Sequence, residues 1–320
     1  MKHLIRPFDI QDFKALHRLR HRGLFLDSIP TLTWGKALVP LGAMLIPLSA
    51  AMGVCTSVFD DVLGDSEKIF AQVSHTIGSP YARFTFVTPD EAIDSPNFSP
   101  LLEYLIRWVG AREARQLIAE VDEKAETFEV LRREHFSIYA RQRIWRLTDI
   151  KGGSGERVGW RQVFSKDEFN VRKLYHAIVP TLVQQVEPSP WDRGGGWAFY
   201  RSGEMLGYAE VFSGFKGVWV QPFIHPETKE VEQLLTGLLK CFNPRKSRPV
   251  YLCLRSYQSW LAHPLETAGA EVSGSQAVMV RHLAVPIKKA ALAPIPQING
   301  GTEPTTSYIK KTLQNGENGS

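Results

Sequence analysis

Short runs in which apolar and polar residues alternate recur along the chain, separated by turn sequences and by longer runs with helical spacing. Alternation with a period of two predicts strands, whereas apolar residues three and four positions apart predict amphipathic helices. In the first half the pattern predicts a helix at 12–20, strands at 56–63, 68–77 and 82–89, a helix at 99–114, a strand at 115–121, a helix at 126–136 and a strand at 137–147.

The second half repeats this order of elements. We expect a helix at 166–186, strands at 196–200, 205–213 and 217–224, a helix at 230–242, a strand at 249–255, a helix at 257–269 and a strand at 277–285. Pro180 and Pro264 lie within two of these helical patterns and are expected to kink or interrupt them, because proline lacks the backbone donor that a helix needs.

A pair of residues near the start of each half supports an internal duplication. Arg6 and Asp12 recur with the same spacing as Arg161 and Asp167. A repeated order of elements together with a repeated pair of residues indicates two tandem copies of one domain. A chain of 320 residues is long enough for two domains.

The sequence therefore divides into two predicted domains and a tail. Residues 1–150 form the first domain, and the glycine-rich run at 151–156 has the composition of a linker. Residues 157–285 form the second domain. Residues 286–320 are rich in Pro, Gly, Thr, Asn and Lys, and we expect them to be disordered because they can bury little apolar surface.

The first copy contains an apolar insertion at 37–54, between its first helix and its first predicted strand. Its length is near the lower limit for a membrane span. Pro40 and Pro47 would break a spanning helix, however, so two short buried helices or a lid over a pocket are favoured over a contact with a membrane surface.

Composition adds little that is specific. A formal net charge of +5, with basic residues in short scattered groups, favours weak attraction to anions and does not indicate a nucleic-acid partner. Three cysteines without a paired motif indicate a reducing compartment. The first residues lack the apolar segment of a signal peptide, so a cytoplasmic location is expected.

The order helix, three-strand meander, helix, strand, helix, strand resembles the N-acetyltransferase (GNAT) superfamily over about residues 4–285, in two copies. The segments that carry the resemblance are GEMLGYAEV (203–211), FIHPETKEVEQLLTGLL (223–239), WLAHPLETAGA (260–270) and FEVLRREHF (128–136). The resemblance implies a mixed α+β fold, with tandem domains that each hold a largely antiparallel sheet flanked by helices.

The resemblance also implies acetyl-CoA or another acyl-CoA as cofactor, with its pyrophosphate on the loop after the fourth strand. Family members have glycines there, which let backbone N–H groups approach the phosphates. The corresponding loops, 88–100 and 225–232, contain no glycine, and the first carries three carboxylates. The second loop is the better candidate, and the cofactor-binding residues that it and the end of the preceding strand offer are Phe223, Ile224, Thr228 and Lys229.

The catalytic residues of the family are not evident in either copy. The positions of its usual tyrosine acid correspond to Leu131 and Leu265, which cannot transfer a proton, although Tyr257 is a possible substitute. Glu120 and Asp122 in the first copy and Glu210 in the second are candidates for a general base. The alternative for both glutamates is a solvated charge at a sheet edge.

Two weaker patterns are interpreted structurally. His17 and His21 have a spacing that can bind zinc, but no third ligand accompanies them, so an exposed basic face is expected and no metal site is predicted. The glycines 194–196 after Arg193 precede a strand instead of a helix, which favours a flexible entry to that strand over a phosphate-binding loop.

Two functions remain open from the sequence. The first is an N-acyltransferase that transfers an acetyl group from acetyl-CoA to a small-molecule or peptide amine, with the second copy binding the thioester. The second is a non-catalytic tandem protein that binds a ligand or acts as a scaffold. The missing glycines and tyrosines favour the second, whereas the family resemblance favours the first.

Overall fold

A computed structural model describes residues 3–36, 53–61, 67–150, 159–193 and 195–284. Most of the insertion at 37–54, the linker at 151–156 and the tail at 286–320 lie outside the described residues. The described residues all belong to one compact unit, and we refer to the parts before and after the linker as the first and second halves.

The first half follows the predicted order of elements. Two short elements, β2 and α2, lie between the first helix and the meander. Its helices and strands are β1 His3–Pro7, α1 Phe13–Leu19, β2 Leu24–Phe25, α2 Ser28–Thr33, β3 Val54–Asp61, β4 Ile69–Ser74, β5 Tyr81–Thr88, α4 Phe98–Gly110, β6 Gln116–Asp122, α5 Glu126–Arg133 and β7 Ser137–Leu147.

The second half repeats the order. Its helices and strands are β8 Trp160–Gln162, α6 Glu168–Ile178, α7 Thr181–Gln184, β9 Gly196–Arg201, β10 Glu204–Ser213, β11 Val218–Ile224, α8 Val231–Lys240, β12 Val250–Arg255, α9 Ala262–Thr267 and β13 Glu271–His282. Five short 3-10 helices complete the description: η1 Ile10–Asp12, η3 Asp90–Asp94, η4 Ser165–Asp167, η5 Pro190–Arg193 and η6 Ser256–Leu261.

The predicted elements are confirmed, and three of them differ most in extent from the prediction. The helix predicted at 166–186 is divided into α6 and α7 at Pro180, as the proline predicted. The helix predicted at 257–269 begins instead as η6, because Gln258 has a non-helical backbone conformation. Strand β13 begins at Glu271, six positions before the predicted residue 277. Strands β1 and β8 were not predicted from the sequence.

The duplicated Arg–Asp pair makes the same structure in both halves. The two terminal guanidinium nitrogens of Arg6, Nη1 and Nη2, donate to the Asp12 carboxylate at 2.6 and 2.8 Å. Arg161 and Asp167 repeat this arrangement at 2.7 and 2.8 Å. Each aspartate also accepts a hydrogen bond from the backbone three residues earlier. The repeat in the sequence therefore corresponds to a repeat in structure.

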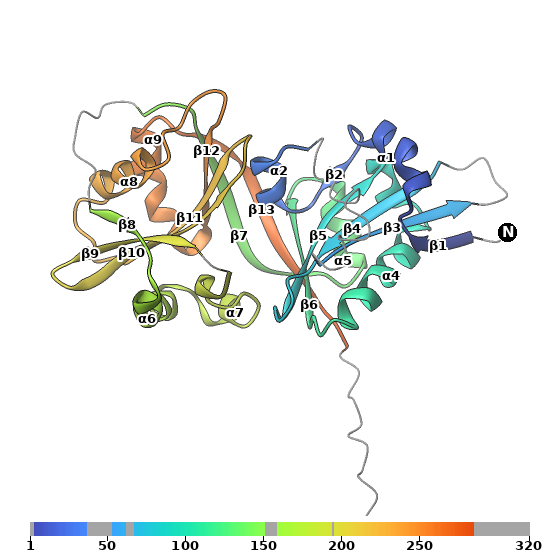
Figure 1. Ribbon diagram of the computed structural model, residues 1–320, viewed down its shortest axis with the longest axis horizontal. Coiled ribbons are helices and arrows are strands. Elements are labelled where there is room, and N and C mark those ends of the chain that lie inside the picture. The colour runs from blue at the N-terminus through green and yellow to red at the C-terminus, as the bar shows by residue number, and fades with distance from the viewer. Residues whose placement is uncertain (1–2, 37–52, 62–66, 151–158, 194, 285–320) are drawn as a thin grey trace, which may run out of the picture. The chain divides into compact units, whose positions relative to one another are not determined.

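All strands belong to one continuous sheet, in the order β1-β3-β4-β5-β6-β13-β7-β12-β11-β10-β9-β8, with β2 pairing to β5. The neighbours are antiparallel except for β5 with β6 and β11 with β12. The two halves exchange their last strands: β13 lies between β6 and β7, and β7 lies between β13 and β12 (Figure 1). The sequence pattern did not predict this exchange.

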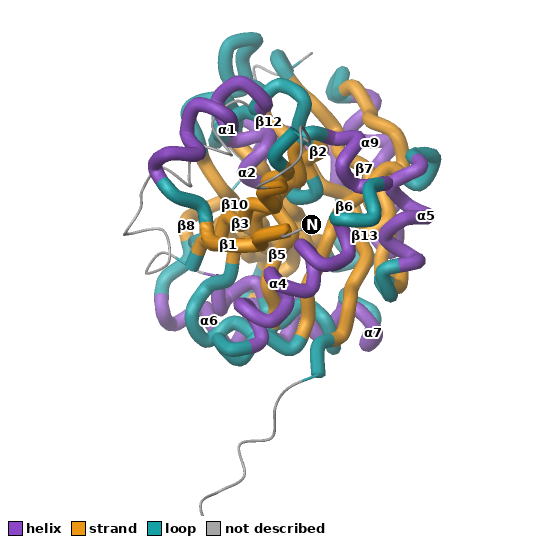
Figure 2. Tube along the Cα trace, turned by 90° about the vertical axis from the view of Figure 1, so that its right-hand side faces the viewer, coloured by secondary structure: helices purple, strands orange, loops and turns teal. Residues whose placement is uncertain are grey.

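Helices cover both faces of the sheet (Figure 2). In the first half, α4 and α5 bury one apolar face together with Met279 from β13, and α1 packs on the opposite face. In the second half, α8 packs on one face and α6 on the other. Because Met279 belongs to the core of the first half, the last strand of the chain stabilises its first part.

Candidate functional site

The sheet opens at two equivalent places, where the parallel strand pairs end. Strands β5 and β6 pair only over Tyr81–Arg83 and Gln116–Ile118. Strands β11 and β12 pair only over Val218–Val220 and Val250–Leu252. Beyond these residues the edges of the strands carry backbone donors and acceptors that need other partners. We call these two places the first and second gaps.

The chain itself closes the first gap. Leu24 and Phe25 pair with the edge of β5 as an antiparallel strand. Leu26 then bridges the gap, because its N–H donates to Thr85 O at 2.9 Å and its carbonyl accepts from the Glu120 N–H at 2.8 Å. Leu26 is fully buried. The first gap therefore holds a short strand between β5 and β6.

A side-chain amide closes the second gap. Gln258 in η6 donates from Nε2 to Pro222 O at 2.6 Å, and its Oε1 accepts from the Ile224 N–H at 3.0 Å. The glutamine is fully buried. Its carboxamide thus satisfies the edge of β11 in the way that a neighbouring peptide group would.

Carboxylates lie at the start of the short helix η3 in the first half and at the start of α8 in the second half. Asp90 and Glu91 lie in the first turn of η3, ahead of α4. Glu230 is the N-cap of α8, in a left-handed conformation, and Glu232 lies in the first turn. A helix N-terminus attracts anions, but carboxylates already placed there repel a phosphate. This agrees with the absence of glycines from both loops.

The predicted cofactor-binding residues fall around the second gap. Phe223 and Ile224 are buried, and the Ile224 amide is bonded to Gln258. The Thr228 hydroxyl is also buried, with no hydrogen-bond partner among the described residues. Lys229 is exposed.

The predicted catalytic residues are dispersed and mostly engaged. Leu131 and Leu265 are fully buried in the two cores. Burial raises the pKa of the Tyr257 phenol. Glu120 pairs with Arg83 at 3.1 Å, and Glu210 pairs with Arg193 at 2.5 Å. Both glutamates are buried, so the alternative that they are solvated charges at a sheet edge is wrong.

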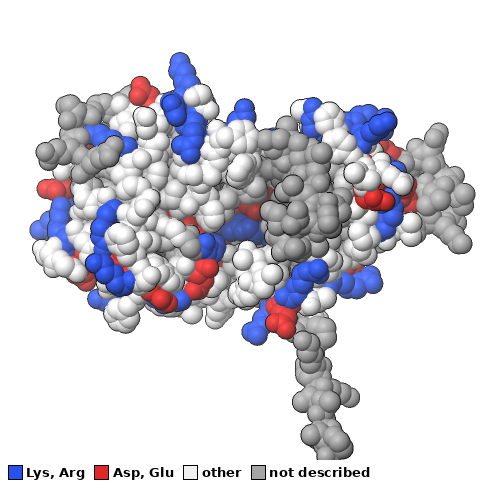
Figure 3. Space-filling model, viewed as in Figure 1, with Lys and Arg blue, Asp and Glu red and all other residues white. Residues whose placement is uncertain are grey.

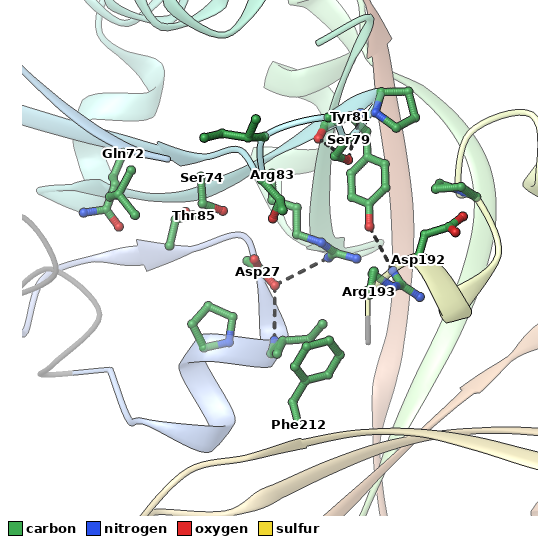
Figure 4. A pocket seen from close by; sticks show the side chains of 18 of the residues that line it. Asp27, Gln72, Ser74, Ser79, Tyr81, Arg83, Thr85, Asp192, Arg193 and Phe212 are labelled. Atoms are coloured by element: carbon green, nitrogen blue, oxygen red, sulfur yellow. Dashed lines mark hydrogen bonds and ion pairs between the residues drawn. The ribbon is translucent and has the colours of Figure 1, made fainter. Parts of the chain in front are cut away.

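A cavity of about 870 Å³ lies beside the first gap, between α2, strands β3 to β5 of the first half, and η5 and β10 of the second half. Its apolar wall includes Ile29, Trp34 and Phe212. Its polar groups include Asp27 and Arg83 (Figure 4). The sequence reasoning missed this site. The signal available was Asp27 followed by Ser-Ile-Pro, which is typical of a helix start.

Asp27 is the acidic group buried against this cavity. It caps α2, and its Oδ1 accepts from the Ile29 N–H at 3.2 Å and lies 3.5 Å from Arg83 Nη1 (Figure 4). Burial raises the pKa of the Asp27 carboxyl to about 6, because the loss of hydration outweighs the attraction of Arg83. The nearby Glu120 carboxylate also contributes to this rise.

The raised pKa of Asp27 predicts a pH-dependent stability difference. The folded state binds the Asp27 proton more tightly than the unfolded chain does, so the free energy of unfolding contributed by Asp27 falls as pH rises from 3.8 to about 6. We expect the wild type to lose up to about 3 kcal/mol relative to Asp27→Asn over this window. Urea unfolding of both proteins across this pH window measures the free energy of unfolding of the wild type minus that of Asp27→Asn. This difference should fall as pH rises, and a difference that stays constant or rises would contradict the prediction.

Both guanidinium groups at the cavity already have carboxylate partners. Arg83 binds Glu120, whose other oxygen accepts from the Ser28 N–H at 3.0 Å. Arg193 binds Glu210 and also donates to the Tyr81 hydroxyl at 3.1 Å. The Arg193–Tyr81 contact joins the two halves at the cavity. The sequence interpretation of 194–196 as a flexible entry to a strand did not anticipate this position of Arg193.

Charges on the surface are mixed. On the face shown in Figure 3, basic and acidic side chains are interspersed. The part of the chain that the structure describes contains no cluster of three or more side chains able to hold a metal ion. None of its helices has the length and apolar character needed to cross a membrane.

No protein-family model matches the chain, and no curated protein sequence does. Solved structures do match. A GCN5-related N-acetyltransferase from Sphaerobacter thermophilus gives a TM-score of 0.54 at 13% identity, over 88% of this chain and 95% of that chain. A tandem GNAT protein from the clavulanic acid biosynthesis pathway gives 0.52 at 13% identity, over 88% and 98%. The chain has the fold of the GNAT acetyltransferases.

This finding confirms the predicted fold class and the resemblance to tandem GNAT proteins. At this level of identity the likeness concerns the fold alone. The function is therefore inferred from the two gaps, the two glycine-free loops and the cavity.

Proposed function

We propose that this GNAT-fold protein binds a small molecule in the cavity between its halves and does not transfer acyl groups from acetyl-CoA. The observation that carries the proposal is the closure of both gaps. An acyl-CoA arm contains amide groups, and to bind along β5 or β11 they would need the backbone groups that Leu26 and Gln258 already use.

The chemistry of both loops supports the same proposal. Neither loop has glycines for a phosphate, and carboxylates lie at the starts of η3 and α8, where they repel a phosphate. Leucines at positions 131 and 265 leave no acid at the place where the family has its tyrosine. The cavity, in contrast, combines apolar walls with buried polar groups, which is the usual character of a small-molecule site.

One observation favours a second candidate, an N-acyltransferase that uses the second half. The second gap is closed by a single side chain, and rotation of Gln258 would expose Pro222 O and Ile224 N–H to an acyl-CoA. The acetyltransferase neighbours in fold are consistent with this candidate. Its acceptor would be an amine.

Thermal unfolding with millimolar acetyl-CoA separates the two candidates. We expect no stabilisation of the wild type. A ligand present at a hundred times its dissociation constant stabilises a protein by about 2.7 kcal/mol, so binding would be easily seen. A clear stabilisation that Lys229→Glu abolishes would refute the proposal and support the acyltransferase.

A further inference from the structure

We infer that the ligand of the cavity is an organic cation with an apolar body and that the Asp27 carboxylate binds its charge. The inference rests on the proposed function. It specifies the ligand by its chemistry, and three features of the buried polar cluster support it: the charge count, the pairing of each carboxylate and the composition of the cavity wall.

The first feature is an excess of negative charge. The buried cluster that spans the two halves contains four carboxylates and three guanidinium groups among the described residues: Asp27, Glu120, Glu187 and Glu210 against Arg83, Arg193 and Arg255. With all seven ionised, one negative charge is unmatched. A buried unmatched charge is costly, so it takes up a proton or a cationic partner.

The second feature locates the unmatched charge at Asp27. Its contact with Arg83 is 3.5 Å, whereas Arg83 lies 3.1 Å from Glu120. The hydrogen bonds that Asp27 receives from described residues all go to its Oδ1. Its Oδ2 is therefore available to a ligand. Asp27 lines the cavity, whereas Glu120, Glu187 and Glu210 do not.

The charged groups that face Asp27 come from three elements. Arg83 on β5 and Arg193 on η5 attract it, and Glu120 on β6 repels it. Both arginines have a second carboxylate as partner, so an incoming anion would compete with Glu120 and Glu210 and would increase the negative excess. Asp192 also lines the cavity, but Arg172 pairs with it at 2.6 Å.

The third feature is the wall around Asp27. The buried Thr85 hydroxyl lines the cavity without a hydrogen-bond partner in the described part of the chain, and so offers an acceptor for a ligand N–H. Trp34 and Phe212 supply aromatic surface. Aromatic faces bind both apolar groups and organic cations, and the cavity therefore suits a cation that carries an apolar body.

Three probes of the same shape and different charge test the inference on the full chain. They are tryptamine, which is a cation at neutral pH, tryptophol, which is neutral, and indole-3-acetate, which is an anion. We expect isothermal titration to show the tightest binding for tryptamine. The Asp27→Asn variant should bind tryptamine at least about tenfold more weakly, since a buried hydrogen bond to a charged group is lost.

Asparagine keeps the oxygen that caps α2, so the variant is expected to fold, and circular dichroism checks this. Asp94→Asn, at an exposed position, is the matched control and should bind tryptamine as the wild type does. Preference for indole-3-acetate, equal binding of tryptamine to Asp27→Asn, or no binding of any probe would each overturn the inference. None of these results bears on acetyl-CoA, whose binding would refute the proposed function instead.

Discussion

Deletion of β13 is expected to abolish cooperative unfolding of the first half. We expect this although more than a hundred residues lie between the end of the first half, at β7, and the start of β13. A chain that ends at Ala270 lacks the strand between β6 and β7. It would expose the backbone edges of both strands and remove Met279 and Ala277 from the core of the first half. Chemical unfolding followed by tryptophan fluorescence and circular dichroism measures this.

The same reasoning predicts that residues 1–150 alone do not form a stable domain. In that fragment β7 would lose both of its neighbours, β12 and β13. A chain that ends at Val285 is the control and should unfold cooperatively, because it keeps the whole compact unit. Cooperative unfolding of residues 1–150 would show that β7 pairs directly with β6, and the strand exchange would then be unnecessary for stability.

Replacement of Gln258 by alanine is expected to destabilise the protein by about 2–4 kcal/mol. The change leaves Pro222 O and the Ile224 N–H without their partner in a buried place, and each orphaned polar group costs about 1–3 kcal/mol. Urea unfolding gives the difference. The estimate allows for some relief from water that enters the second gap.

Gln233→Ala is the matched control for this prediction. Gln233 is exposed on α8, and its replacement should change the free energy of unfolding by less than about 0.5 kcal/mol. Equal effects of the two substitutions would mean that the carboxamide of Gln258 does not close the second gap.

The order of the helices and strands could be predicted from the sequence because it depends on local periodicity. The partners of the strands could not. The sequence patterns of β7 and β13 would allow either strand to pair with β6 or with β12. Which strand pairs with which depends on contacts between residues far apart in the chain. Closure of the first gap by Leu24–Leu26 was missed for a related reason, because a strand of two residues shows no period.

The burial of Glu120 and Glu210 had a signal in the sequence. Both glutamates stand between alanine and valine in strands that are apolar on both faces, at 117–121 and 205–211. A strand covered on both faces leaves no solvated side for a charge. A buried, ion-paired glutamate was therefore the better expectation.

Hydrogen exchange at three backbone amides tests the closure of both gaps most directly. The amides of Leu26 and Glu120 lie in the first gap, and that of Ile224 lies in the second. We expect all three to exchange as slowly as the amides of the central strands, with no change when acetyl-CoA is added. Exchange at the rate of exposed loops, or protection that arises only with acetyl-CoA, would show that the gaps are open to a cofactor.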